Sequence, residues 1–186
     1  IVYDKLVDEN KREFNVKLTV HIRKNEDELS FWADIENNCD ARVNELELPF
    51  IELSKACDEN RENDVLYRCR GLGERIENPW QALESNHTEY MAADYSEIWS
   101  PMVYPRPANM AWYGLESGGH FLYIARYDNM GRTCTFNVGI GARNTDPRLV
   151  FTICHYPLAL KGETLEVPKT VVSLVEGDWR YGSNKY

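Results

Sequence analysis

Residues 14–36 read Phe-Asn-Val-Lys-Leu-Thr-Val-His-Ile-Arg-Lys-Asn-Glu-Asp-Glu-Leu-Ser-Phe-Trp-Ala-Asp-Ile-Glu. Apolar and polar side chains alternate over residues 14–23 and again over 29–36, which is the period of a half-buried β-strand. The charged stretch 24–28 between them has the composition of a turn. This segment therefore predicts an antiparallel hairpin with one face toward a core.

The same alternation returns along most of the chain. It predicts about ten strands in all, with further segments at 46–50, 110–116, 120–127, 133–140, 148–156 and 170–176. A single ambiguous segment, 90–98, is predicted as a short helix or an irregular strand. Helices do not alternate with strands, which excludes a Rossmann domain or a barrel enzyme. We expect an all-β chain, an antiparallel β-sandwich with at most one short helix.

Composition limits the partners. Lys and Arg number 21 and Asp and Glu number 30, which gives a net charge of −9. An acidic surface disfavours nucleic acid and anionic membranes and is compatible with neutral ligands such as sugars. No apolar run approaches the roughly 20 residues of a membrane-spanning helix. We therefore expect no nucleic acid and no membrane among the partners.

The cysteines favour free thiols. There are five of them, an odd number, without a Cys-x-x-Cys pair, at positions 39, 57, 69, 134 and 154. Buried free thiols are typical of a reducing compartment, so the cysteines favour a cytoplasmic location over a disulfide framework.

Catalytic motifs are missing from the sequence. The four histidines lack the spacing of a metal site, and there is no Gly-x-Ser-x-Gly nucleophile motif. Gly71-Leu72-Gly73 is too short for a phosphate loop. We expect no catalytic residue, no metal and no cofactor. His21, His120 and His155 are predicted as a solvated strand residue, a turn-end residue and a hydrogen-bonded residue at the core edge.

Aromatic side chains are the better functional signal. The long segment between residues 54 and 107 carries Trp80, Trp99 and Tyr104, with His87 among them. Indole and phenol rings stack on the apolar faces of sugar rings, so these four residues are candidates for carbohydrate binding. Core packing is the competing interpretation for each aromatic ring, and for Trp112 it is the favoured one.

Two short segments carry a resemblance to a known family. Residues 121–128 read Phe-Leu-Tyr-Ile-Ala-Arg-Tyr-Asp, and 177–186 read Gly-Asp-Trp-Arg-Tyr-Gly-Ser-Asn-Lys-Tyr. They resemble segments of the β-supersandwich domain, a galactose mutarotase-like fold, that precedes the (β/α)₈ catalytic barrel of glycoside hydrolase-like proteins. The full sandwich of such families is usually longer, so we expect its first strands upstream of Ile1.

The resemblance also implies the domain organisation. Residues 1–176 would form the β-sandwich, and 177–186 would start a linker to a downstream catalytic domain of the same chain. Trp179 and Tyr181 would then be interface anchors for that domain. On this interpretation, truncation after Glu176 would leave the sandwich folded.

Three functions follow from these observations. The first is a non-catalytic accessory domain that supports the barrel and contacts carbohydrate. The second is a lectin-like carbohydrate-binding module. The third is an aldose 1-epimerase, but the family's mutarotases use two histidines and a glutamate, and no matching motif is present here. A shared fold does not imply a shared activity.

Overall fold

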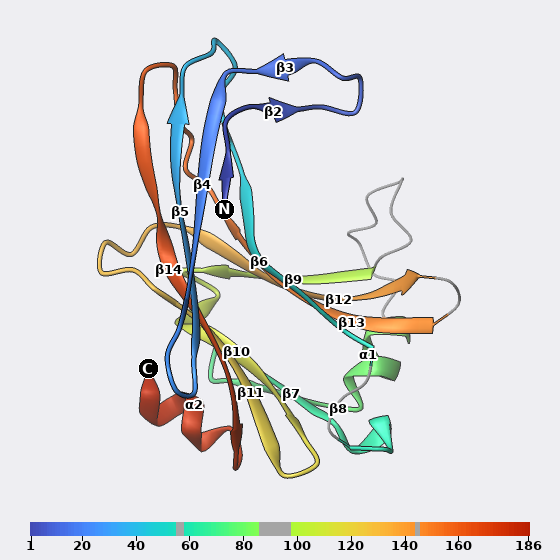
Figure 1. The fold of residues 1–186 in the computed structure, drawn as a ribbon. Coiled ribbons are helices and arrows are strands. Elements are labelled where there is room, and N and C mark those ends of the chain that lie inside the picture. Colours follow the sequence, from blue (N-terminus) through green and yellow to red (C-terminus); the bar gives the residue numbers. More distant parts are fainter. Residues whose placement is uncertain (55–57, 86–97, 144–145) are drawn as a thin grey trace.

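Two antiparallel sheets form the framework of the protein (Figure 1). The computed structural model describes residues 1–54, 58–85, 98–143 and 146–186. The hairpin predicted from residues 14–36 is confirmed: β4 (Val16–Lys24) pairs antiparallel with β5 (Leu29–Asn37) along its whole length. The backbone N–H of Asn25 donates to the Glu28 carbonyl at 2.8 Å and closes the turn.

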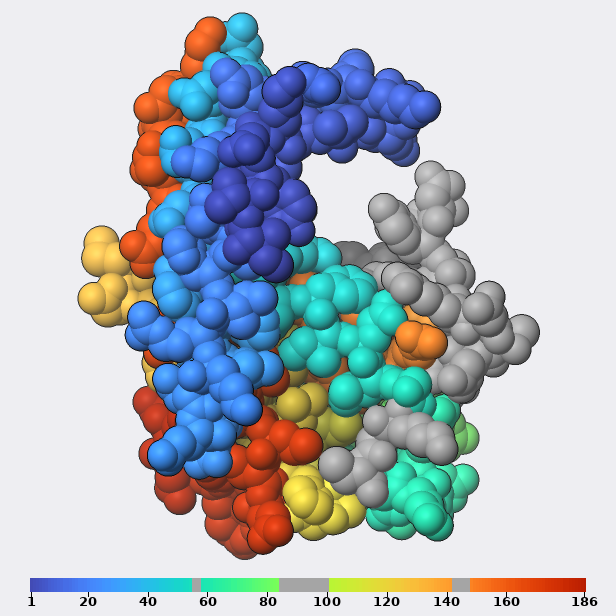
Figure 2. All heavy atoms as spheres, in the orientation of Figure 1, coloured from blue at the N-terminus to red at the C-terminus, as the bar shows by residue number. Residues whose placement is uncertain are grey.

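The larger sheet has eight strands. Their spatial order is β1 (Val2–Tyr3), β4, β5, β14 (Thr164–Glu176), β11 (His120–Tyr127), β10 (Ala108–Ser117), β7 (Val65–Arg70) and β8 (Glu74–Glu77). The smaller sheet has four strands, in the order β6 (Leu46–Leu53), β13 (Asp146–His155), β12 (Cys134–Arg143) and β9 (Ile98–Tyr104). A separate hairpin of β2 (Leu6–Val7) and β3 (Glu13–Phe14) projects from one end, as the blue segment in Figures 1 and 2 shows. The predicted all-β antiparallel sandwich is confirmed.

Helices differ from the prediction. The described residues contain two short α-helices, α1 (Pro79–Ser85) and α2 (Arg180–Lys185), where at most one was expected. The segment 90–98, predicted as a short helix or an irregular strand, falls almost wholly outside the described residues, and Ile98 begins β9. Asn78 caps α1 by accepting from the Gln81 N–H at 3.2 Å, and Pro79 occupies the first turn, where its missing N–H costs nothing. In the described part of the chain, no helix is long and apolar enough to span a membrane.

The main core lies between the two sheets. Its fully buried members come from both layers, among them Leu66, Tyr113 and Ile124 from the large sheet and Phe136, Leu149 and Phe151 from the small one. A second apolar cluster covers the opposite face of the large sheet. It contains Cys69, Trp112, Phe121, Tyr123, Ala125 and Val171, with Tyr181 of α2 packed against them. The central strands β10 and β11 are therefore covered on both faces.

Four of the five cysteines are free thiols: Cys39, Cys69, Cys134 and Cys154. The last three are buried in strands. The prediction of free thiols is confirmed for these four, and Cys57 lies outside the described residues.

His155 is a buried core histidine that makes stability depend on pH. Its Nε2 lies 2.9 Å from the Leu48 carbonyl, and its Nδ1 has no hydrogen-bond partner within the described residues. Burial lowers the pKa of His155 to about 4. A histidine in the unfolded chain titrates near 6.5, so between these values the unfolded state binds more protons.

We expect His155 to contribute full stability above pH 6.5 and to lose it as the pH falls toward 4. The loss is about 2 kcal/mol at pH 5, before most carboxylates titrate. Urea unfolding at pH 7, 6 and 5 measures it, with NMR titration of the His155 ring as the site-specific control. A ring midpoint near 6.5 in the folded protein would contradict this assignment.

Candidate functional site

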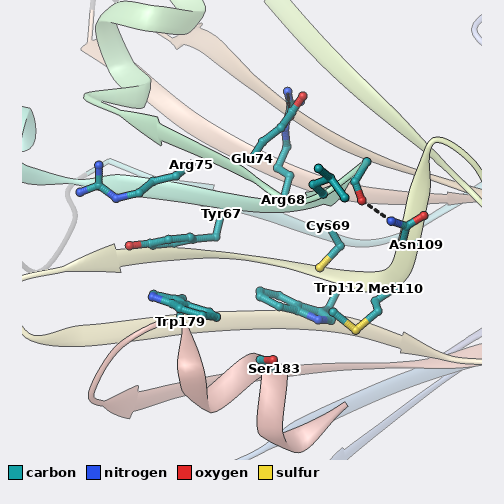
Figure 3. Close-up of a pocket in the computed structure, with 13 residues that line it drawn as sticks. Tyr67, Arg68, Cys69, Glu74, Arg75, Asn109, Met110, Trp112, Trp179 and Ser183 are labelled. Atoms are coloured by element: carbon teal, nitrogen blue, oxygen red, sulfur yellow. Dashed lines mark hydrogen bonds and ion pairs between the residues drawn. The ribbon is translucent and has the colours of Figure 1, made fainter.

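A cleft of about 570 Å³ opens on the outer face of the large sheet, the face that carries α2. Strands β7, β8 and β10 form its floor and one side, and the C-terminal residues form the other side (Figure 3). The aromatic, aliphatic and sulfur-containing side chains that line the cleft are Tyr67, Cys69, Leu72, Met110, Trp112 and Trp179.

Strand alternation decides which side chains reach the cleft. Tyr67 and Cys69 belong to the outer cluster, as do Met110 and Trp112 on the neighbouring strand. The intervening Arg68 is paired in register with Glu74, and the two side chains form an ion pair at 2.6 Å. In Figure 3 both point away from the cleft. The cleft is thus lined mainly by aromatic and apolar groups, because Arg68 and Glu74 alternate to the other face and Arg75 stays on the cleft side at its rim.

The C-terminal segment supplies one wall. The Trp179 ring lies roughly parallel to the Tyr67 ring, with centroids 6.0 Å apart and an interplanar angle of 27°. Tyr181 contacts Tyr123 edge-on at 5.8 Å. A Cβ at Gly182 would come within 3.0 Å of Tyr123 and 3.1 Å of Trp112. Only glycine therefore lets the helix approach the sheet this closely.

An ion pair fastens the same helix at its far end. The ammonium of Lys185 lies 2.9 Å from the carboxylate of Glu28, in the β4–β5 turn, and also donates to the Tyr181 hydroxyl at 2.8 Å. Asp178 accepts from the backbone N–H of Arg180 at 2.9 Å at the start of α2. The segment predicted as the beginning of a linker thus packs on this domain's own sheet. Whether it also leads to a further domain stays a prediction.

Polar groups stand at the rim of the cleft. Arg75 is half-exposed and paired with Glu77, Asn109 donates to the Gly71 carbonyl, and Ser183 lies on α2. Burial raises the pKa of the Cys69 thiol to about 12, which keeps it protonated and unreactive at neutral pH. The cleft can therefore bind through ring faces and hydrogen bonds, but Cys69 is no nucleophile.

Trp80 lies elsewhere, in the core between the sheets. It is 5% exposed, its indole N–H donates to Asp64 at 2.7 Å, and the Arg61 guanidinium covers its ring at 4.4 Å. Such a ring offers no free face to a sugar. We therefore assign Trp80 to the core instead of a ligand surface, as a correction to its candidacy from sequence.

Of the other candidates from sequence, the structure describes the side chain of Tyr104 alone. His87 lies outside the described residues, and so does the side chain of Trp99. The backbone of Trp99 lies in β9 and pairs with Gly139 of β12. Tyr104 ends β9, is half-buried and packs against the main core. Of the two predicted interface anchors, Trp179 remains 39% exposed at the cleft, while Tyr181 is half-buried against the sheet.

The described histidines all lie away from the cleft. His21 stacks on Trp32 at 4.9 Å and contacts Asp34 at 2.8 Å, on the outer strands β4 and β5. His120 follows the β10–β11 turn, and His155 is buried in β13. Within the described residues, no group of three or more His, Cys, Asp or Glu side chains is arranged to hold a metal ion.

The architecture defines the class of fold: a β-sandwich of the galactose mutarotase-like fold. No protein-family model matches the sequence, and no curated protein is similar to it. Among solved structures, the chain is similar to an Escherichia coli K12 protein to which an aldose 1-epimerase activity is attributed, with a TM-score of 0.52 and 8% sequence identity. The similarity covers 94% of this chain and spans 64% of the length of that protein. At this identity the likeness shows the fold alone.

Proposed function

We propose that this chain is a carbohydrate-binding β-sandwich domain without a catalytic centre of its own. The observation that carries the proposal is the cleft on the large sheet, where the rings of Tyr67 and Trp179 lie over the buried Trp112 and beside rim groups that can hydrogen-bond. Ligand sites are typically concave and mostly apolar, with few polar groups that fix orientation. The shared fold with a protein named for acting on aldoses supports a sugar as the ligand class.

The chemistry of the cleft favours binding over catalysis. Proton transfer at a sugar's anomeric centre needs an acid and a base within hydrogen-bond reach. Among the described residues that line the cleft there is no histidine, and Glu74 is the single acidic one. In Figure 3 the Glu74 side chain points away from the rings of Tyr67 and Trp179. An aldose 1-epimerase is the second candidate, favoured by the fold alone. Acceleration of α-glucose or α-galactose mutarotation, followed by polarimetry, would support it and contradict a binding-only role.

The accessory role beside a catalytic domain belongs to the same proposal. It is supported by the resemblance of residues 177–186 to the segment that leads into the catalytic barrel of glycoside hydrolase-like proteins. Trp179 would then serve both the cleft and the neighbouring domain. A parent sequence without β/α repeats downstream of Tyr186 would contradict this part of the proposal.

Trp179 provides the direct test of the binding site. We expect monosaccharides and disaccharides, titrated against intrinsic tryptophan fluorescence and by calorimetry, to identify a sugar that binds, and Trp179→Ala to weaken it roughly tenfold, about 1.4 kcal/mol. Trp32→Ala is the matched control, because Trp32 lies on the same sheet but outside the cleft and stacks on His21. Equal loss in both variants, or no response to any sugar, would contradict the site.

A further inference from the structure

The two ends of the cleft differ in chemistry. In Figure 3, Tyr67, Trp179 and Arg75 lie toward one end, while Met110 and Asn109 lie toward the other, with Trp112 and Cys69 between them. The first end offers aromatic faces and a guanidinium. The second end is built from sulfur-containing side chains and from the β7–β8 turn, residues 71–73, which also lines the cleft.

Leu72 is the most unusual residue of the apolar end. It is as exposed as a leucine in an extended peptide, at 108%. It stands at the tip of the β7–β8 turn between Gly71 and Gly73, whose positive φ angles of 59° and 101° suit glycine.

The turn that presents Leu72 is held in place. The N–H of Gly71 donates to the Pro107 carbonyl at 2.9 Å, the N–H of Gly73 donates to the Arg70 carbonyl at 2.9 Å, and Asn109 donates to the Gly71 carbonyl. These bonds fix the turn to the neighbouring strand, so the leucine stays at the edge of the cleft without packing on its own domain. Its apolar surface is available for a ligand to cover.

Met110 and Cys69 continue the apolar surface inward from Leu72. Met110 is half-buried and Cys69 is 6% exposed, and both belong to the outer apolar cluster with Trp112. The thioether is flexible enough to adapt to an apolar group. Asn109, the polar neighbour at this end, is already bonded to the Gly71 carbonyl. A sugar ring placed here would lose hydroxyl hydration and face mainly apolar groups, with the remaining amide groups of Asn109 as partners.

The volume also fits an extended ligand. About 570 Å³ lies within the range of pockets that bury drug-sized molecules, which are larger than one sugar ring. One ring against Tyr67 and Trp179 leaves the Leu72 end for a second group of apolar character.

We infer that the cleft binds a glycoside with an apolar aglycone, aryl or short alkyl, with the sugar at the Trp179 end and the aglycone against Leu72 and Met110. This inference rests on the proposed function, since it names the class of carbohydrate that the same cleft takes. The inferred ligand differs from a free aldose, which has no apolar group to occupy the Leu72 end of the cleft.

Matched ligands test the inference. The probes are methyl and phenyl glycosides of glucose and galactose in both anomeric forms, together with phenol, titrated by calorimetry against the whole chain. We expect the best phenyl glycoside to bind at least tenfold more tightly than its methyl counterpart, because the aglycone covers apolar surface. We expect phenol alone to bind much more weakly than the phenyl glycoside.

Single substitutions test where the sugar and the aglycone bind. Leu72→Ser should remove most of the phenyl advantage and leave methyl glycoside affinity unchanged, and Trp179→Ala should weaken both. Leu160→Ser, at another exposed leucine outside the cleft, is the control and should change neither. Leu72 is fully exposed, so its replacement should not disturb folding.

The remaining outcomes overturn either the aglycone inference alone or the proposed function as well. Equal affinity for methyl and phenyl glycosides would overturn the aglycone inference and leave sugar binding intact. Phenol that binds as tightly as the phenyl glycoside would overturn the inference, since the sugar would then add nothing. No binding of any glycoside would overturn both the inference and the proposed function.

Discussion

Gly114→Ala is expected to destabilise the sandwich by at least about 3 kcal/mol, the upper end of the usual cost of overpacking. A Cβ at this position would lie 2.5 Å from the carbonyl oxygen of Leu122 and would also collide with the Phe121 ring. The ring could turn aside, but the carbonyl belongs to the backbone of the paired strand β11. Relief therefore requires the two central strands to separate.

Thermal unfolding measures this effect. For a chain of this size the loss corresponds to a fall in Tm of about 6–12 °C. The double variant Gly114→Ala/Phe121→Leu removes most of the ring contact and keeps the carbonyl contact, so it should recover little of the loss. A single variant that melts within 2 °C of the wild type would contradict the close approach of β10 and β11.

Deletion of residues 177–186 is expected to have an effect of similar size, about 4 kcal/mol or some 8–16 °C in Tm. The deletion removes Tyr181 and Trp179 from their ring contacts with Tyr123 and Tyr67. It also exposes Trp112 and the rest of the outer aromatic cluster to water. This expectation reverses the one from sequence, which treated the segment as a linker outside the core.

Single substitutions in α2 test whether the stability comes from docking of the segment on the sheet. Gly182→Ala should cost a smaller part of the loss, because its Cβ would push the helix away from Tyr123 and Trp112 by a few tenths of an ångström. Asn184→Ala, on the exposed side of α2, is the matched control and should stay near wild type. Equal melting of the full chain and the 1–176 chain would instead restore the linker interpretation.

The fold could be predicted from sequence because most strands have one face toward a core and one toward solvent. The alternation in residues 14–36 predicted β4 and β5, and apolar runs bounded by turns predicted β10 to β14, although β10 and β11 are covered on both faces. The two helices were harder to predict from sequence. α1 has seven residues and α2 has six, too short for a helical period to emerge.

The cleft could not be predicted for a related reason. Strand β7 reads Val-Leu-Tyr-Arg-Cys-Arg, and both of its faces are largely covered, so apolar and polar residues do not alternate cleanly. Tyr67 and Cys69 were therefore not singled out. The one available signal is Gly71-Leu72-Gly73, which is too short for a phosphate loop but holds an apolar side chain between two glycines.

The presence of an aromatic ring in the sequence also does not tell whether that ring contacts a ligand or packs in the core. Trp80 and Trp179 look alike in the sequence, each beside a polar or charged segment. The structure buries the first under Arg61 and leaves the second half-exposed, because α1 lies beside the small sheet and α2 lies on the outer face. The difference depends on contacts between distant segments, which local pattern does not contain.

The wall of the cleft is a helix of six residues, and a helix this short does not persist in water by itself. The segment is therefore helical only while it is docked on the sheet, so helix formation and docking are a single equilibrium. With a docking free energy of a few kcal/mol, on the order of one molecule in a thousand would have the wall detached at any moment. Any ligand that contacts Trp179 would lower that fraction further, so occupancy of the cleft and order of the C-terminal segment must rise and fall together.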